Sequence, residues 1–106
     1  MKNIHLIPTD KSSRLLLTAD RGFTIMTYPY NNSSAHHINI TNDEEIKERD
    51  WCYDKVLNII FQTDEHTDFT YVNLTNYVSK IILTTDQELI NDGVQSIDDE
   101  FLEWFV

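Results

Sequence analysis

Tyr77-Val78-Ser79-Lys80-Ile81-Ile82-Leu83-Thr84 is the stretch with the strongest strand signal in this chain of 106 residues. Its apolar residues cluster in one short run, and polar residues lie on both sides of it. A run of this length, rich in β-branched side chains, is typical of a strand buried in a sheet. We therefore expect a strand over 77–84.

Two short helices are predicted after this strand. Thr85-Asp86-Gln87-Glu88 has the pattern of a capping box, and Asp92-Gly93 offers a residue that tolerates the left-handed conformation found at helix ends. Ser96-Ile97-Asp98-Asp99 would begin the second helix, because carboxylates in a first turn complement the helix dipole. Four apolar side chains then recur on one helical face: Ile97, Phe101, Trp104 and Phe105.

The segments before residue 77 have the pattern of short strands joined by turns. Two hairpins are expected, one of Arg14–Thr18 with Phe23–Tyr28 and one of Trp51–Tyr53 with Val56–Phe61. Strands are also predicted over 4–7 and 36–40, loops over 29–34 and 62–68, and a helical turn over 43–47. These elements indicate an α+β fold, a small antiparallel sheet or partly open barrel with C-terminal helices packed on it. The length predicts a single domain, 1–106.

Charge is distributed unevenly along the chain, whose formal net charge is −10. Residues 1–42 contain four basic and two acidic side chains, a sum of +2, whereas residues 43–106 contain four basic and sixteen acidic ones, a sum of −12. Seven carboxylates follow Lys80, and no lysine or arginine does. Such a surface repels nucleic-acid phosphates and attracts basic proteins. We therefore expect a basic protein partner and no direct binding of nucleic acid.

Several classes of protein lack their sequence signals here. The single cysteine, Cys52, permits no intramolecular disulfide. The first residues lack the apolar core of a signal peptide, and no apolar run approaches the length of a membrane span. We therefore expect a cytoplasmic protein in a host cell, with no membrane attachment. Gly22 and Gly93 are the only glycines, too few for a glycine-rich phosphate-binding loop, and we expect no cofactor.

The candidate partner-binding residues form two groups of carboxylates, each with a tryptophan. They are Asp43, Glu44, Glu45, Glu48, Asp50 and Trp51, and Asp98, Asp99, Glu100, Glu103 and Trp104. The carboxylates could occupy a basic groove that normally receives phosphates, and the tryptophans could anchor the contact. The alternatives are a charged face that only keeps the protein soluble, and a Trp104 packed in the core. An exposed C-terminal end, Trp104-Phe105-Val106, would also suit a homodimer.

The histidines and the cysteine give weak signals of chemistry. His36 and His37 are adjacent, so on a strand they point to opposite faces and cannot easily share a metal ion. His66 lies in an acidic loop whose spacing matches no zinc or calcium motif. Cys52 has no histidine partner evident in the sequence, which favours a buried structural thiol over a nucleophile. We therefore expect no catalytic residue and no metal ligand.

Three segments carry a resemblance to a known family: His5-Leu6-Ile7-Pro8-Thr9-Asp10-Lys11, Ile40 through Trp51, and Lys80 through Val106. They resemble an uncharacterised family of small proteins of phages and of flavobacterial and related genomes, often encoded near mobile DNA. The central block of that family usually reads Gly-Asp-Trp, whereas this chain has Arg49-Asp50-Trp51. Arg49 must therefore follow an ordinary backbone path or adopt a strained one. The resemblance implies a mobile-element accessory protein, without supplying a reaction.

These features predict a non-enzymatic inhibitor or adaptor of the phage type. It would bind a basic host protein that handles nucleic acid, such as a nucleic-acid-guided nuclease, and could act as an anti-CRISPR protein that blocks an effector or its guide-RNA loading. One alternative is a small ligand-binding module or enzyme of phage nucleotide metabolism, with His36, His66 or Cys52 beside carboxylates in a concave pocket. Another is a virion assembly protein, which would form a large ring.

Overall fold

The predicted strand over 77–84 is confirmed, and it lies near the middle of the sheet in a computed structural model that describes residues 3–20, 22–31 and 34–105. Lys2, Arg21, Asn32, Ser33 and Val106, which belong to patterns discussed above, lie outside the described residues. The described chain forms eight strands and three helices, in this order: β1 (Ile4–Pro8), β2 (Ser13–Thr18), β3 (Gly22–Tyr30), β4 (Ala35–Asn42), β5 (Trp51–Asp54), β6 (Ile59–Gln62), α1 (Phe69–Leu74), β7 (Val78–Thr84), α2 (Gln87–Asn91), β8 (Gln95–Ser96) and α3 (Asp99–Phe105).

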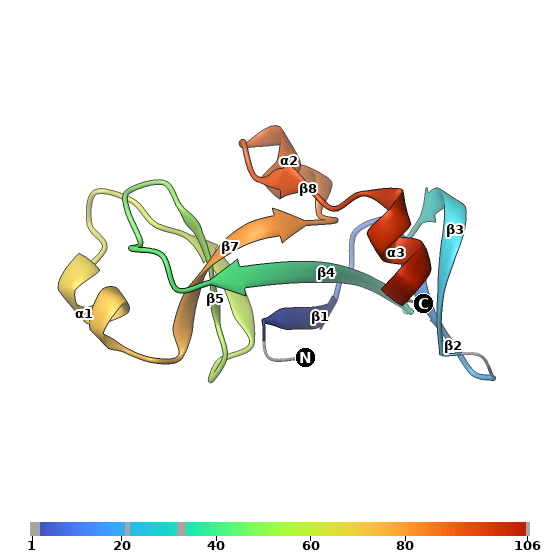
Figure 1. Cartoon of the computed structure of the whole chain (residues 1–106), viewed down its shortest axis with the longest axis horizontal. Coiled ribbons are helices and arrows are strands. Elements are labelled where there is room, and N and C mark those ends of the chain that lie inside the picture. The colour runs from blue at the N-terminus through green and yellow to red at the C-terminus, as the bar shows by residue number, and fades with distance from the viewer. Residues whose placement is uncertain (1–2, 21, 32–33, 106) are drawn as a thin grey trace.

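The strands form one curled, half-open sheet, and α2 and α3 lie over one side of it (Figure 1). The strand order is β3-β2-β4-β7-β5-β6, with β1 added beside β4 and β8 beside β7. All pairings are antiparallel except the short one between β7 and β8. The structure therefore has the predicted α+β class, a partly open barrel-like sheet with C-terminal helices packed on it.

The sheet branches because β4 has three partner strands on its two edges. β1 pairs with β4 from His36 to Ile40 along one edge. On the other edge β2 pairs only at Ala35 and His36, whereas β7 pairs from Asn39 to Asn42. Strands β2 and β7 therefore share one edge of β4 and diverge between these two contacts. We call this divergence the sheet fork.

The two predicted hairpins are present. Strands β2 and β3 turn at Gly22, whose φ of 72° is readily adopted by glycine. Strands β5 and β6 turn over residues 55–58, where Asn58 has a φ of 55°. Asparagine tolerates this left-handed conformation, which explains why the second hairpin needs no glycine. Strand β3 extends through Pro29 to Tyr30, so the predicted loop starts later than expected.

The helical turn predicted over 43–47 is wrong. Thr41, which begins the capping pattern Thr41-Asn42-Asp43-Glu44 before this turn, is a buried residue of β4, and the following segment is an irregular loop. A helix that was not predicted, α1, lies at residues 69–74 instead, and Asp68 caps it by accepting a hydrogen bond from the Tyr71 amide at 3.0 Å. Its aromatic and β-branched residues have low helix propensity, so packing of the buried Val72 and the cap must stabilise it.

The two C-terminal helices are confirmed, with one change in the buried face. Asp86 caps α2 and accepts a hydrogen bond from the Glu88 amide at 3.0 Å, and Gly93 follows with a φ of 108°. In α3 the buried residue is Leu102, 5% exposed, whereas Trp104 is 64% exposed. Of the two positions that the sequence left open for Trp104, core or surface, the structure has the surface one, because α3 packs on the sheet through Phe101, Leu102 and Phe105.

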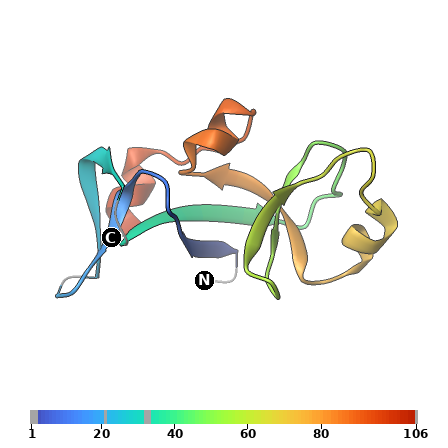
Figure 2. The same ribbon diagram turned by 180° about the vertical axis from the view of Figure 1, so that it is seen from behind.

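Three apolar clusters form the core of a molecule that measures 44 × 25 × 25 Å. One cluster, built on Leu15, Ile38, Ile97 and Leu102, joins the sheet to α3. A second, built on Ile46, Cys52, Val72 and Val78, joins the sheet to α1. The third contains Tyr53, Ile81 and Leu89, so α2 packs between the other two. The long axis thus separates α1 from α3, as the two opposite views show (Figure 1 and Figure 2).

Candidate functional site

The two predicted acidic groups lie at opposite ends of the long axis. The segment 43–50 lies beside α1, whereas residues 98–104 lie in and before α3 at the other end (Figure 1 and Figure 2). The structure therefore does not bring the eleven predicted residues into one surface. Each end has to be judged as a separate site.

The loop at the α1 end is held by one amide side chain. Asn73 Oδ1 accepts a hydrogen bond from the Ile46 amide at 2.7 Å, and Asn73 Nδ2 donates to the Ile46 carbonyl at 3.1 Å and to the Phe69 carbonyl at 2.9 Å. Ile46 is buried, and the flanking Glu45 is exposed. This contact fixes the loop against α1 and turns its carboxylates outward.

The side chains of Asp50 and Trp51 make their contacts within the molecule. Asp50 Oδ2 accepts a hydrogen bond from the Lys47 amide at 2.8 Å and lies 3.7 Å from Lys80 Nζ. The Trp51 indole donates to Asp92 Oδ2 at 2.8 Å and its ring packs against the cluster of Ile81 and Leu89. These two residues of the predicted surface therefore mainly organise β5 and its neighbours.

The α3 end presents an exposed tryptophan between carboxylates. Trp104 is 64% exposed, and its ring lies 5.5 Å from that of Phe101. Asp98, Glu100 and Glu103 are exposed around it, and Asp98 also caps α3 by accepting a hydrogen bond from the Phe101 amide at 2.8 Å. We call Asp98, Glu100, Glu103 and Trp104 the α3 surface.

Folding neutralises part of the charge difference between the two parts of the chain. Lys11 pairs with Glu88 of α2, and Arg14 Nη1 lies 3.0 Å from Asp99 Oδ1 of α3. Lys80 lies 3.6 Å from Glu44 and 3.7 Å from Asp50. Among the described residues, six predicted carboxylates have no ion pair: Asp43, Glu45, Glu48, Asp98, Glu100 and Glu103. Each of the two predicted acidic groups therefore keeps three carboxylates without an ion pair among the described residues.

Cys52 and the histidines have largely structural surroundings. Burial raises the pKa of the Cys52 thiol to about 12, so the thiol stays protonated and is a poor nucleophile at neutral pH. His66 is 85% exposed in its loop, and the His36 ring lies 5.1 Å from that of Phe23. No group of three or more His, Cys, Asp or Glu side chains in the described part of the chain could hold a metal ion.

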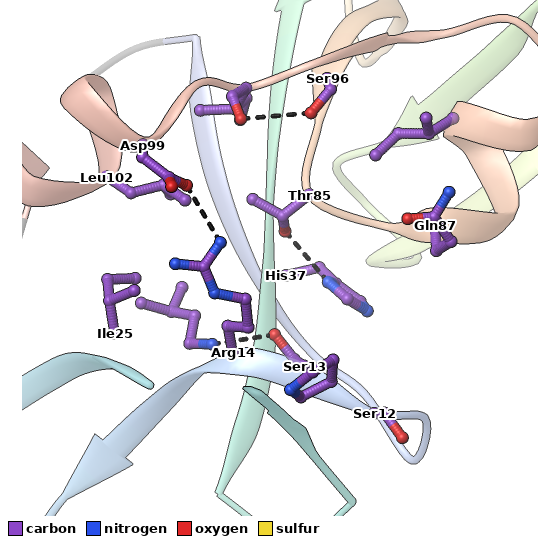
Figure 3. A pocket seen from close by; sticks show the side chains of 14 residues that line it. Ser12, Ser13, Arg14, Ile25, His37, Thr85, Gln87, Ser96, Asp99 and Leu102 are labelled. Carbon is purple, nitrogen blue, oxygen red and sulfur yellow. Dashed lines mark hydrogen bonds and ion pairs between the residues drawn. The ribbon is translucent and has the colours of Figure 1, made fainter. Parts of the chain in front are cut away.

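The sheet fork contains a partly open cavity of about 200 Å³ that the sequence did not reveal (Figure 3). We call it the fork cavity. Residues from β2, β3, β4, α2, β8 and α3 line it, and the polar ones include Ser12, Arg14, His37, Thr85 and Asp99. His36, His66 and Cys52, the residues expected in a ligand pocket, do not line it. The alternation along β4 marked His37 as facing away from His36, but no local pattern showed which strands would diverge there.

Burial lowers the pKa of His37, and the negative charge of Asp86 only partly opposes this effect. The His37 ring is therefore neutral at pH 7. Its Nδ1 lies 3.0 Å from Thr85 Oγ1, so β4 and the start of α2 are joined at the edge of the cavity. A neutral imidazole can donate one hydrogen bond and accept one, which suits it to a polar contact with a ligand.

Comparisons with known proteins add no relative. No helix in the described ranges is both long and apolar enough to cross a membrane. No family model matches the chain, and neither a curated protein nor a solved structure matches it significantly.

Proposed function

We propose that this chain is a non-enzymatic, phage-type accessory protein that binds a basic host protein through the α3 surface. The partner class is a protein that handles nucleic acid, and an anti-CRISPR role against an effector nuclease or its guide-RNA loading is the specific form of the proposal. The observation that carries it is the exposed Trp104 between carboxylates that have no ion pair among the described residues.

The net charge of −10 supports a basic partner over a nucleic acid. Unpaired carboxylates at both ends would attract a basic channel and increase the rate of encounter. The elongated shape, 44 Å by 25 Å, would let one end enter such a channel while the other remains outside. The thiol of Cys52, protonated and buried, gives no support to covalent catalysis.

Trp104 supplies an apolar contact, which the carboxylates cannot provide. Tryptophan is among the residues that contribute most to protein interfaces, particularly where polar groups surround it. Its indole is free to be buried because α3 already packs on the sheet through other residues. Because the Trp104 ring is mostly exposed, its removal should cost the fold little stability. A contact role is therefore favoured over a folding role.

The test uses a purified CRISPR effector nuclease, with and without guide RNA, and measures the dissociation constant at about 50 mM and about 200 mM salt. We expect the protein to bind the guide-free effector and to bind less tightly at the higher salt concentration. Trp104→Ala should weaken binding by roughly 30-fold, which corresponds to about 2 kcal/mol for a central interface residue. A double variant, Glu100→Gln with Glu103→Gln, should weaken binding and reduce its dependence on salt.

Leu74→Ala is the matched control, because Leu74 is 81% exposed at the opposite end of the molecule. This variant should bind as the natural sequence does. Absence of binding to either form of the effector would reject the anti-CRISPR assignment. Salt-independent binding, or an equal loss in the Leu74 and Trp104 variants, would reject the α3 surface as the docking site.

A further inference from the structure

The fork cavity exists because two strands leave the same edge of β4. Strand β2 contacts β4 at Ala35 and His36, and β7 rejoins that edge from Asn39 onward. Between these two contacts the Thr85 amide donates a hydrogen bond to the Ile38 carbonyl at 3.1 Å. Side chains of α2, β8 and α3 complete the lining, and the cavity remains partly open. The cavity is therefore built into the sheet topology.

The lining combines apolar side chains with a few hydrogen-bonding groups. Leu15, Ile97 and Leu102 belong to the adjoining core cluster. Arg14, His37 and Gln87 are its nitrogen-bearing polar side chains. Asp99 is its single carboxylate among the described residues. A mostly apolar wall with a few oriented polar groups is the usual composition of small-molecule sites.

His37 forms part of the polar wall of the fork cavity. The residue is 5% exposed, and its Nδ1 lies 3.0 Å from Thr85 Oγ1. That hydroxyl oxygen also accepts a hydrogen bond from the Ile38 amide at 3.0 Å, so the ring is held beside the start of α2. The ring also lines a neighbouring pocket with Lys11 and Asp86, and we therefore assign it no direct contact with an occupant of the fork cavity.

Arg14 spans the cavity from β2 to α3 (Figure 3). Its Nε donates to the Met26 carbonyl at 2.8 Å, and its Nη1 donates to Asp99 Oδ1 at 3.0 Å. The Asp99 side chain is 70% exposed, whereas that of Arg14 is 37% exposed. Asp99 can therefore turn into solvent at little cost, and another carboxylate can take its place on a guanidinium that stays fixed by Met26.

The volume limits the size of an occupant. A cavity of about 150 Å³ accommodates benzene, and the fork cavity measures about 200 Å³. Sites for drug-sized ligands begin at about 300 Å³. The occupant is therefore a single ring with one or two small substituents.

We infer that the fork cavity binds a small organic carboxylate with a ring-sized apolar body. The carboxylate replaces Asp99 on Arg14, and the ring packs against Leu15 and Leu102. This site is independent of the α3 surface proposed as the docking site, although Asp99 lies in the same helix. Its occupant is a metabolite-sized molecule and not a macromolecule.

The test is a titration of the ¹⁵N-labelled protein with benzoate, 4-hydroxybenzoate and benzamide, followed by amide chemical shifts. We expect shifts at residues 12–15, 85–87 and 96–102, with a dissociation constant of about 1 mM for benzoate. 4-Hydroxybenzoate should bind about as tightly as benzoate, and benzamide should bind at least about tenfold more weakly, because only the carboxylates can form the ion pair with Arg14.

Two variants with opposite expected effects keep the test decisive if one of them folds poorly. Arg14→Gln should weaken benzoate binding at least about tenfold, whereas Asp99→Asn should strengthen it by removing the competing carboxylate. Arg49→Gln, which removes an exposed cation outside the cavity, is the control and should change nothing. Equal affinities for benzoate and benzamide, shifts scattered over the surface, or an absence of shifts at high benzoate concentration would overturn the assignment.

Discussion

Arg49 shows strain at a single residue. Its φ of 71° lies in the left-handed region, which costs a non-glycine residue about 1–2 kcal/mol. Of the two backbone paths open to Arg49 before β5, the structure therefore has the strained one. Hydrogen bonds fix this conformation, since the Arg49 amide donates to the Thr63 carbonyl at 3.1 Å and Gln62 Nε2 donates to the Arg49 carbonyl at 3.1 Å.

Arg49→Gly should stabilise the protein. Relief of the strain outweighs the larger backbone entropy of glycine in the unfolded chain, and we expect the free energy of unfolding to rise by about 0.5–1 kcal/mol. The guanidinium lies 4.0 Å from Asp92 and is 75% exposed, so its loss matters little. Urea unfolding measures the change. Arg49→Ala loses the same charge and keeps the strain, so an equal rise in that variant would contradict this explanation.

At the scale of the structural elements, the Asn73 side chain holds the 43–48 loop against α1 through hydrogen bonds. One side-chain amide accepts one backbone hydrogen bond and donates two, so it satisfies polar groups that no strand or helix pairs. Neither the loop nor α1 has strong intrinsic structure, and each depends on this contact. The loop's conformation is therefore a property of the pair and not of either segment alone.

Asn73→Asp should destabilise the protein by about 1–3 kcal/mol, because the new carboxylate oxygen would face two backbone carbonyls that have lost their donor. Hydrogen exchange should accelerate most at the Ile46 amide and in α1. Asn91→Asp is the matched control: it adds the same charge, and Asn91 Oδ1, which accepts from Gln87 Nε2 at 2.7 Å, remains an acceptor. Similar losses in both variants would mean that charge and not the lost donors is responsible.

At the scale of the whole molecule, repulsion between carboxylates opposes folding. The net charge is −10, and the ion pairs of Lys11, Arg14 and Lys80 offset only part of it. Exposed pairs contribute at most about 1 kcal/mol each, whereas uncompensated charge acts over the full surface. The molecule thus keeps a strong negative field at some cost in stability.

Sodium chloride should therefore raise the melting temperature between about 10 mM and about 150 mM, as the screening length falls from about 30 Å to about 8 Å. Calorimetry at neutral pH measures the change. A double variant, Glu100→Lys with Glu103→Lys, reduces the net charge from −10 to −6, since each substitution adds two positive charges. It should show a smaller rise. A melting temperature that falls with salt would mean that attractive pairs dominate.

Short-range patterns predicted most of the elements but not all of their partners. Hairpins β2–β3 and β5–β6 and the caps of α2 and α3 follow from turn residues and carboxylates a few positions apart. Helix α1 was not predicted because its stability comes from tertiary packing. The helical turn predicted at 43–47 was wrong because Thr41 belongs to β4. The α3 carboxylates and Trp104 were predicted from sequence as contact residues, but the sequence left a core position for Trp104 open as an alternative.

The sequence by itself determined where most strands and the two C-terminal helices form and how strongly acidic the chain is, because those properties depend on residues within a few positions of one another. Only the tertiary structure decided that the two acidic groups separate, that Lys11 and Arg14 meet C-terminal carboxylates, and that β2 and β7 diverge around a cavity. Such contacts join segments far apart in the chain. They are selected by competition among all possible pairings, which no local pattern records.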